Sequence, residues 1–540
     1  MLKLSVWVQQ RLGNGGYRPL KNKVDLSEKV DEADSSELDE YVEVHEVEIP
    51  HRHLSWVKHL KKLVVLLPSF LHPSSPTEKP ADLHRTAWLD GLRGVAAFFV
   101  VWHHMSLIWF PWSIHNGWTS FRDPLIRFPI VRLAISGLPN VMVFFVISGY
   151  ALSHKPLRLL RQDRRAEAYD ALASSTFRRH PRLFLPAVLL CLPCILAAYA
   201  GAYGDGARMP GAAVPTQNPP RCATPWQQAL DFAAAAARLC DPFSGGAIGW
   251  AYNNALWTLP VEFRGSLVVF GLLLALARVR SAARLSLVLL VAIYCLCFAH
   301  WAEFLFVGGM LVADLQFATA ETGEDWGLGL GLGLGLVLPE GHGAGSKRPR
   351  RIRAIVAVAL RWWRRVLECR ALQHAASLLS FLGALYVLGM PKLDRGGADT
   401  PGYRALAALI PERWRTAGSP DHFWPAIAAV WLVWTIGHAP FLQRAFTCRF
   451  AQYLGRISYP LYLVHLPMLH SFGFRMGKAF LGLTGSDTEV RYLVGVAMAA
   501  AVVWVMVVWV ADLGWRFVDV KVVGFAAWGY GRLGKRTGGR

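Results

Sequence analysis

One stretch of sequence decides the fold: Trp88-Leu-Asp-Gly-Leu-Arg-Gly-Val-Ala-Ala-Phe-Phe-Val-Val-Trp-His-His-Met105. It is strongly apolar, and yet it contains Arg93 and His104, which are eleven residues apart. At about 100° per residue this spacing makes about three helical turns, so both side chains lie on one helix face. The rise between them is about 16 Å, or about half the hydrocarbon core of a bilayer. In a membrane-spanning helix Arg93 would lie near one surface and His104 near the middle, where a titratable side chain indicates a functional site.

The composition favours a membrane protein. The chain has 540 residues, of which 54% are hydrophobic and only 17% are charged, whereas soluble domains carry about a quarter charged residues. The net charge of +20 would also fit a nucleic-acid-binding protein. However, the Lys and Arg residues gather in loops between apolar runs, as membrane topology requires. We therefore expect a lipid bilayer as a partner and no nucleic acid.

The apolar runs predict an all-α, polytopic membrane helix bundle with about ten transmembrane helices. The fifth and sixth runs are separated by a tight turn at residues 300–303, because together they are too long for one helix. The predicted spans are 92–110, 138–154, 183–201, 256–277, 283–299, 304–319, 371–390, 422–438, 453–473 and 491–513.

Loop charges predict the orientation of these spans. If both termini are cytosolic, all four basic clusters lie on the cytosolic side, as the positive-inside rule requires. The less basic, Gly- and Pro-rich loops 202–255 and 391–421 are then lumenal. Cys222 and Cys240 share the first of these loops, so a disulfide and two free thiols both remain compatible with the sequence. The four clusters are 155–182 (with Arg161), 278–284 (with Arg284), 347–353 and 532–540.

Four regions follow from these patterns. Residues 1–85 are polar and rich in both charges, and predict a disordered cytosolic arm. Within it, residues 56–67 are compatible both with an interfacial helix and with disorder. Residues 86–520 form the membrane domain. Within it, 320–352 is a low-complexity Gly-Leu and basic segment, and alternating glycine favours a linker over a helix. Residues 521–540 form a basic cytosolic tail.

Two further stretches carry charged candidates for a site. Glu262 lies inside or at the edge of the span 256–277, and the nearby Arg264 is its predicted partner. Arg179 and Arg182 open the third span at the cytosolic surface. Positive-inside topology alone would explain these two arginines, although Arg is also well suited to hold phosphates.

Two other stretches carry candidates with polar or aromatic side chains. Ser148 and Tyr150 end the second span at a small-residue break, which close helix packing would equally explain. His465 lies in the middle of the ninth span, where a hydrogen-bonded core histidine and a site residue are equally compatible with the pattern. The eight cysteines show no metal-ligand spacing, so we expect no metal site.

Taken together, these residues resemble the acyltransferase-3 family of multi-pass membrane acyltransferases, and the chain looks like a eukaryotic, fungal-type member. The resemblance covers roughly residues 85–520. One departure is that Asp519 is followed by Val520, where the family often has a Glu-x-Pro element. The matching elements are, in order, Arg93 with His104, Phe144–Tyr150, Arg179 with Arg182 and Pro186, Trp257 with Glu262, and Ser458–His465.

The resemblance implies a membrane-bound O-acyltransferase that moves an acyl group, often acetyl, from acyl-CoA to a hydroxyl of a carbohydrate or a small lipophilic acceptor. It implies no permanently bound cofactor, with acyl-CoA, expected to be acetyl-CoA, as the donor substrate. It also implies an endomembrane or plasma-membrane protein. His104 would act as the base, Arg93, Arg179 and Arg182 would hold CoA phosphates, and Glu262 would orient His104 or an arginine. Ser148, Tyr150, Trp257 and His465 would line the site.

Two other functions fit parts of the same pattern. A multi-pass transporter or flippase would use the intramembrane Arg, Glu and His residues as a substrate or proton path. We find no inverted repeat of broken helices in the sequence, which many transporters have. A catalytically silent membrane scaffold would not need His104. The sequence leaves the oligomeric state open.

Overall fold

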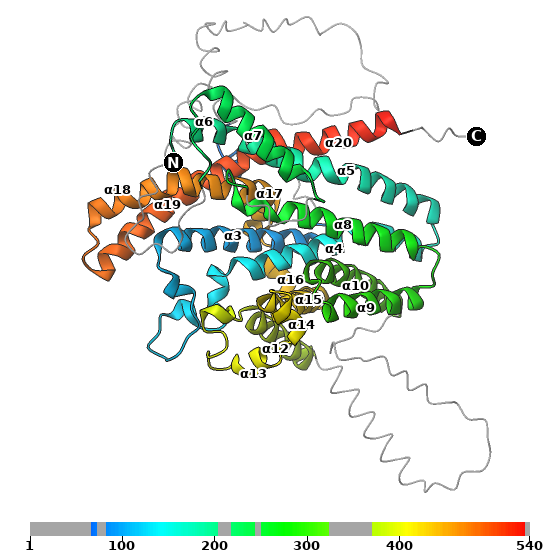
Figure 1. Ribbon diagram of the computed structural model, residues 1–540. Coiled ribbons are helices and arrows are strands. Elements are labelled where there is room, and N and C mark those ends of the chain that lie inside the picture. Colours follow the sequence, from blue (N-terminus) through cyan, green and yellow to red (C-terminus); the bar gives the residue numbers. More distant parts are fainter. Residues whose placement is uncertain (1–65, 73–82, 204–217, 244–249, 323–369, 535–540) are drawn as a thin grey trace, which may run out of the picture. The chain divides into compact units, whose positions relative to one another are not determined.

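The computed structural model describes residues 66–72, 83–203, 218–243, 250–322 and 370–534 (Figure 1). Every regular element in these ranges is a helix, so the prediction of an all-α fold is confirmed there. Several predicted regions lie outside the described residues. These are residues 1–65 and 73–82 of the arm, including most of the stretch 56–67, residues 323–352 of the Gly-Leu segment, and residues 535–540 of the tail.

In the described ranges, ten long helices form the bundle, and each overlaps one of the ten predicted spans. They are α3 (Ala87–Trp109), α4 (Gly137–Arg161), α5 (Arg165–Cys191), α8 (Thr258–Ala275), α9 (Ser281–Cys297), α10 (Trp301–Thr322), α12 (Arg370–Leu388), α15 (Phe423–His438), α17 (Arg449–Met468) and α19 (Glu489–Gly514).

Shorter elements connect these helices. The α-helices are α6 (Pro193–Tyr199), α7 (Pro225–Cys240), α13 (Arg404–Ala408), α14 (Glu412–Thr416), α16 (Pro440–Thr447), α18 (Phe474–Thr484) and α20 (Val520–Leu533). The 3₁₀ turns are η1 (Ser69–Leu71), η2 (Trp112–His115), η3 (Leu125–Arg127), η4 (Val131–Ile135), η5 (Asn254–Trp257), η6 (Leu393–Arg395) and η7 (Pro420–His422). The π-helical turns η8 (Leu469–Gly473) and η9 (Trp515–Asp519) continue α17 and α19.

The number of helices able to cross a membrane is lower than ten by length and composition. Seven described helices are long and apolar enough, and the pair α15–α16, bent by 100°, brings the number to eight. Helix α9 has only 17 residues. Helix α17 is more polar, since it carries Arg449, Gln452 and Arg456 in its first half. The exact count of ten spans is therefore not confirmed, although the tight turn before α10 is present at Phe298–His300.

Helices α3 and α17 pack closely across a seam of glycines. A Cβ atom at Gly94 would lie 2.3 Å from the backbone nitrogen of Gly455, and one at Gly455 would lie 2.5 Å from the carbonyl oxygen of Asp90. Because neither position has room for a side chain, the two backbones can approach each other closely. This seam fixes the face of α3 that carries Arg93 and His104 against α17.

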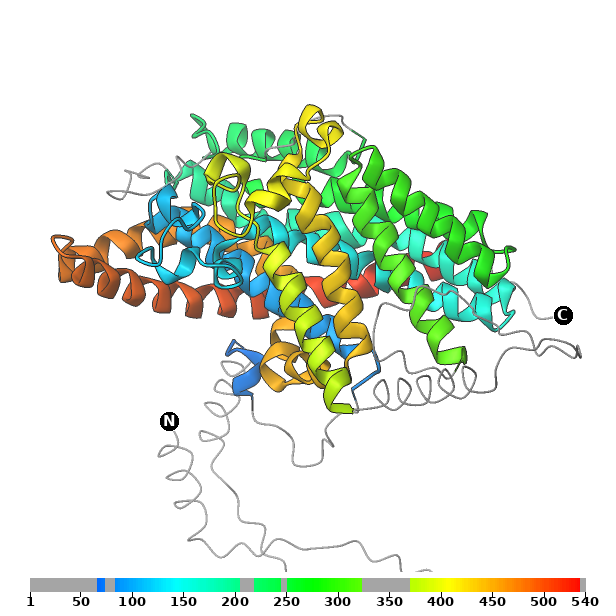
Figure 2. The same cartoon turned by 90° about the horizontal axis from the view of Figure 1, so that it is seen from below.

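A second close contact joins α4 and α10. A Cβ atom at Gly149 would lie 2.1 Å from the carbonyl oxygen of Phe306, and one at Gly309 would lie 2.1 Å from that of Val146. Figure 2 shows α12 and α15 lying side by side, and α15 also packs against α4 and α10. Helix α4, which carries Ser148, is therefore held on several sides.

A buried ion cluster closes the end of the α4–α10 contact. The Asp314 carboxylate on α10 is fully buried and accepts hydrogen bonds from Arg161 at 2.8 Å and from Arg284 at 2.8 and 2.9 Å. The side chains of Arg161 and Arg284 are only 4% and 2% exposed. These two arginines are thus structural partners of Asp314 and not the loop charges that the sequence pattern predicted.

The short segment at residues 66–72 packs against α19. The backbone nitrogen and hydroxyl of Ser69 donate to the Asp512 carboxylate at 3.1 and 2.6 Å. Trp509 and Arg516 donate to backbone carbonyl oxygens of the segment at 2.6 and 2.8 Å. This part of the predicted arm is therefore anchored on α19 through a buried carboxylate. Elsewhere, Cys222 and Cys240 are both free thiols.

Candidate active site

A cavity of about 410 Å³ lies between α3, α4, α5, α8, α17 and η9. Its volume falls within the range of about 300–1,000 Å³ that is typical of small-molecule sites. The cavity brings together five residues that the sequence predicted for the site, although they come from four helices. These residues are Arg93, Ser148, Arg179, Arg182 and Glu262.

The cavity lining is strongly basic. Six of its side chains are Lys or Arg (Arg93, Lys155, Arg178, Arg179, Arg182 and Arg456), and two are acidic (Glu262 and Asp519). Lys155, Arg182 and Arg456 are exposed at the cavity. Among the residues that the structure describes, the Arg182 guanidinium forms no hydrogen bond or ion pair, so it is available to a ligand. Such a lining attracts a polyanion with phosphate groups.

Glu262 is held inside the cavity by two other helices. Its carboxylate accepts a hydrogen bond from Arg179 on α5 at 2.8 Å and from Ser148 on α4 at 3.0 Å. Arg179 also donates to the Ser266 hydroxyl at 2.8 Å. The predicted partner, Arg264, is not the one observed, because residues two apart on a helix point in nearly opposite directions. The arrangement fixes the orientation of Arg179 toward the cavity.

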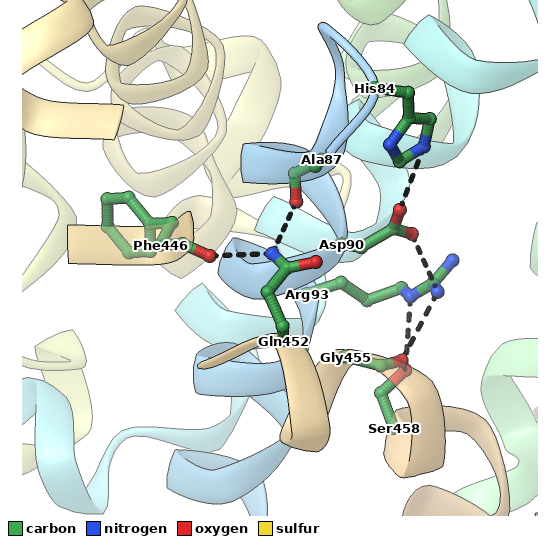
Figure 3. A network of polar contacts seen from close by, with 8 residues as sticks. All are labelled: His84, Ala87, Asp90, Arg93, Phe446, Gln452, Gly455 and Ser458. Carbon is green, nitrogen blue, oxygen red and sulfur yellow. Dashed lines mark hydrogen bonds and ion pairs between the residues drawn. The ribbon is translucent and has the colours of Figure 1, made fainter. Parts of the chain in front are cut away.

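Arg93 is oriented by α17 and by its own helix (Figure 3). Its guanidinium donates to the Ser458 hydroxyl at 3.0 Å, to the Asp90 carboxylate at 3.0 Å and to the Gly455 carbonyl oxygen at 3.4 Å. His84 contacts the other oxygen of Asp90 at 3.4 Å. Arg93 therefore stands at the cavity in a fixed direction, with its side chain still 39% exposed.

His104 lies about 16 Å further along α3 and does not line the cavity itself. Its ring centroid is 5.0 Å from that of His465 on α17. Tyr462, which does line the cavity, has its ring centroid 5.6 Å from that of His465. Arg93 and His104 thus both lie on the face of α3 that contacts α17, which agrees with the single helix face predicted by the spacing of eleven residues. The ring of His465 contacts both His104 and Tyr462 of the cavity lining.

His103 faces a different part of the molecule. Its Nδ1 donates to the Ile135 carbonyl oxygen at 2.6 Å, and its ring lies against Gly137, where a Cβ atom would be 2.4 Å away. The neighbouring His115 lies in the loop after α3, and burial lowers the pKa of its imidazole to about 3. A neutral His115 ring can then hydrogen bond to the Ser106 hydroxyl at 3.2 Å. His103 is therefore engaged in holding this loop, which leaves His104 as the histidine directed at α17.

Two predicted site residues point elsewhere. The Tyr150 hydroxyl donates to the side-chain carbonyl of Gln316 on α10, and its ring packs against Trp88 and His154. Trp257 has its ring 6.4 Å from that of Trp301. Neither residue lines the cavity described here. Their positions in the α4–α10 region and in the turn before α8 indicate packing roles.

Sequence reasoning did not assign several residues that line the cavity. Lys155 lies two helical turns after Ser148 on α4. The helix period therefore predicts that both residues lie on the same face. Arg456 and Asp519 come from α17 and η9, and nothing in their local sequence indicates that these elements meet α5. The other lining residues not assigned include Arg178, Thr258, Ser458, Tyr459 and Tyr462.

Comparison with known proteins identifies the family. A family model described as "Acyltransferase domain", that of the acyltransferase-3 family, matches residues 86–515. The chain belongs to the acyltransferase-3 family. It is therefore an acyltransferase, and the match runs from the first residues of α3 to the end of α19. Together with the apolar helices, this family membership makes it a membrane protein.

Three curated fungal proteins are similar to this chain over most of their length. "O-acetyltransferase PaAT-1" of Phomopsis amygdali is 41% identical over 483 residues, covering 87% of this chain and 89% of that protein. "Acyltransferase clz18" of Cochliobolus lunatus is 23% identical, covering 84% and 96%. "Acyltransferase R4" of Phoma sp. (strain ATCC 20986 / MF5453) is also 23% identical, covering 82% and 94%. No solved structure matches the chain.

Proposed function

We propose that this acyltransferase transfers an acetyl group from acetyl-CoA to a hydroxyl of a carbohydrate or a small lipophilic acceptor. The observation that carries the proposal is the basic cavity, whose Arg93 shares one face of α3 with His104. The similarity to a protein named as an O-acetyltransferase supports acetyl as the transferred group and oxygen as the acceptor atom. We further infer that the protein resides in an endomembrane or in the plasma membrane.

The cavity suits the charged part of acetyl-CoA. Arg93, Arg179 and Arg182 would hold the phosphates, and Lys155 and Arg456 would add positive charge at the same cavity. Glu262 would act on Arg179 and not on His104, since it accepts a hydrogen bond from that arginine at 2.8 Å. The uncharged pantetheine arm would then extend past Tyr462 toward His104.

His104 would serve as the general base. In its neutral form it removes the proton from the acceptor hydroxyl while that oxygen attacks the carbonyl carbon of the thioester. A carbon–oxygen bond forms, the carbon–sulfur bond breaks, and the proton passes from His104 to the departing CoA thiolate. The products are the acetyl ester and CoA, and His104 returns to its neutral form.

We also propose that both termini are cytosolic, because this orientation puts the basic loops on the cytosolic side. Reporters fused after Arg165, at Ser346 and at Arg540 are expected to be cytosolic, whereas tags near Gly211 and Gly402 are expected to be lumenal. Protease protection of each tag in sealed membranes measures the side directly. A lumenal reporter at Ser346 would contradict the proposal. Ser346 and Gly402 would then lie on the same side of the membrane, although the single predicted span 371–390 separates them.

Replacing Arg182 with glutamine is expected to weaken acetyl-CoA binding by about tenfold or more. A charge-assisted hydrogen bond is worth about 1.5–3 kcal/mol, and about 1.4 kcal/mol corresponds to a factor of ten. Titration of labelled acetyl-CoA onto the purified protein measures the change in Kd.

The matched control is Arg158→Gln, which removes the same charge from an exposed position on α4 outside the cavity lining. It is expected to leave the Kd unchanged. Equal weakening by both substitutions would mean that only net charge matters. Absence of saturable binding to the unsubstituted protein would overturn the acetyl-CoA donor and favour a transporter.

A further inference from the structure

His465 stands opposite His104 at the contact between α3 and α17. The side chain of His465 is fully buried, and its ring centroid lies 5.0 Å from that of His104 at an interplanar angle of 44°. By contrast, His104 is only half-buried, and within the described part of the chain its ring forms no hydrogen bond. Two imidazoles are therefore in contact, with one of them closed off from solvent.

The hydrogen bonds of His465 define which of its nitrogens carries the proton. Its Nδ1 lies 2.8 Å from the carbonyl oxygen of Tyr462 and 3.2 Å from that of Leu461. Since a carbonyl oxygen can only accept, Nδ1 must donate, and in the neutral ring Nε2 then bears a lone pair. Nε2 is buried and has no hydrogen-bond partner among the described residues.

A buried acceptor without a donor costs about 1–3 kcal/mol, and such groups in native proteins call for an explanation. His103, whose ring is 5.1 Å from that of His104, is not an equivalent partner, because its side chain is only half-buried and so its Nε2 is not closed off from solvent. Among the described residues, only His465 combines a ring in contact with that of His104 with an Nε2 that is buried and has no partner.

We propose that His465 is a positioning residue for His104, an inference that rests on the proposed acetyl transfer. When the substrates are bound, its Nε2 accepts a hydrogen bond from the N–H of His104, so that the other nitrogen of His104 carries the lone pair directed at the acceptor hydroxyl. When His104 takes up the proton, the same hydrogen bond stabilises the imidazolium until the proton passes to the CoA thiolate. His465 itself gains and loses no proton.

Two substitutions separate this role from a purely structural one. His465→Asn keeps an N–H near the position of Nδ1, so it retains the bond to Tyr462, but it removes the acceptor that faces His104. His465→Gln places a carbonyl oxygen near the position of Nε2 and loses the bond to Tyr462. A packing role predicts that Asn is tolerated better, whereas a positioning role predicts that Gln is tolerated better.

The experiment measures kcat and KM for acetyl transfer by the full-length protein in membranes or detergent. His465→Asn is expected to lower kcat about tenfold to a hundredfold, the size of effect seen for hydrogen-bond partners of metal-binding histidines, with the KM for acetyl-CoA unchanged. His465→Gln is expected to retain most of the kcat. In a His104→Ala background, adding His465→Asn should cause no further loss, because His465 acts through His104.

The outcomes distinguish the two levels of the proposal. An unsubstituted protein that transfers no acetyl group would overturn the proposed function and this inference with it. Normal transfer together with an unimpaired His465→Asn variant would overturn the positioning role alone. If the His465→Asn variant fails to accumulate, the His465→Gln variant tests the positioning role instead. A folded His465→Gln variant that is as inactive as His104→Ala would also overturn this role.

Discussion

Replacement of His104 by alanine is expected to lower the rate of acetyl transfer by about 100- to 10,000-fold, the usual contribution of general acid–base catalysis. The variant should still fold, because the His104 side chain is only half-buried. Acetyl-CoA binding should be retained, since the cavity lining does not include His104. Mass spectrometry of acetylated metabolites and glycans from cells that express each variant measures the loss of product.

The neighbouring histidine provides the control. His103→Ala removes the hydrogen bond from Nδ1 to the Ile135 carbonyl oxygen, which is expected to cost about 0.5–1.5 kcal/mol of stability. Its effect on transfer should be smaller, because His103 points about 100° away from His104 around the helix. An equal loss of transfer in both variants, or normal transfer by His104→Ala, would remove the base assignment.

The part of the site on α3 could be predicted because it depends on local geometry. The spacing of Arg93 and His104 is fixed by the helix period alone, and the structure places both residues against α17. The same reasoning explains why Ser458 and His465 both face α3, since they are seven residues, or about two turns, apart on one helix. Sequence periodicity therefore predicts faces well.

Partners across helices could not be predicted in the same way. Glu262 pairs with Arg179, 83 residues away in the chain, and not with the nearby Arg264. Which helices meet depends on close backbone contacts such as those at Gly94 and Gly455, and a single sequence does not reveal them. For the same reason the sequence distinguishes Asp519 only as a departure from a motif, although this residue lines the cavity.

Charge patterns also have a limit. The positive-inside rule counts every arginine near a span end, but it does not distinguish a solvated charge from a buried one. Arg161 and Arg284 look like ordinary loop charges in the sequence, and both are buried against Asp314. These two arginines thus contribute to the stability of the bundle, and the consequence can be measured.

Asp314→Asn is expected to lower the free energy of unfolding by about 3–5 kcal/mol, the usual cost of removing one partner from a buried ion pair. The substitution keeps the shape of the side chain but leaves the two guanidinium groups of Arg161 and Arg284 buried without their counter-charge. Both arginines donate to the Asp314 carboxylate at 2.8–2.9 Å, and Asp314 itself is fully buried. Unfolding of the purified protein in mild detergent, followed by tryptophan fluorescence, measures the change.

The control for Asp314→Asn is a substitution in an exposed ion pair at the start of α5. Arg164 and Glu167 are 2.6 Å apart, but their side chains are 53% and 55% exposed. Solvent screens such a pair, so Glu167→Gln is expected to leave the free energy of unfolding nearly unchanged. If Asp314→Asn proved as stable as Glu167→Gln, the buried cluster would not hold α4 against α9 and α10.

If Asp314→Asn lowers stability as expected, α4 loses its fixed position at the cavity. Acetyl transfer then falls together with stability, because Ser148 and Lys155 lie on that helix.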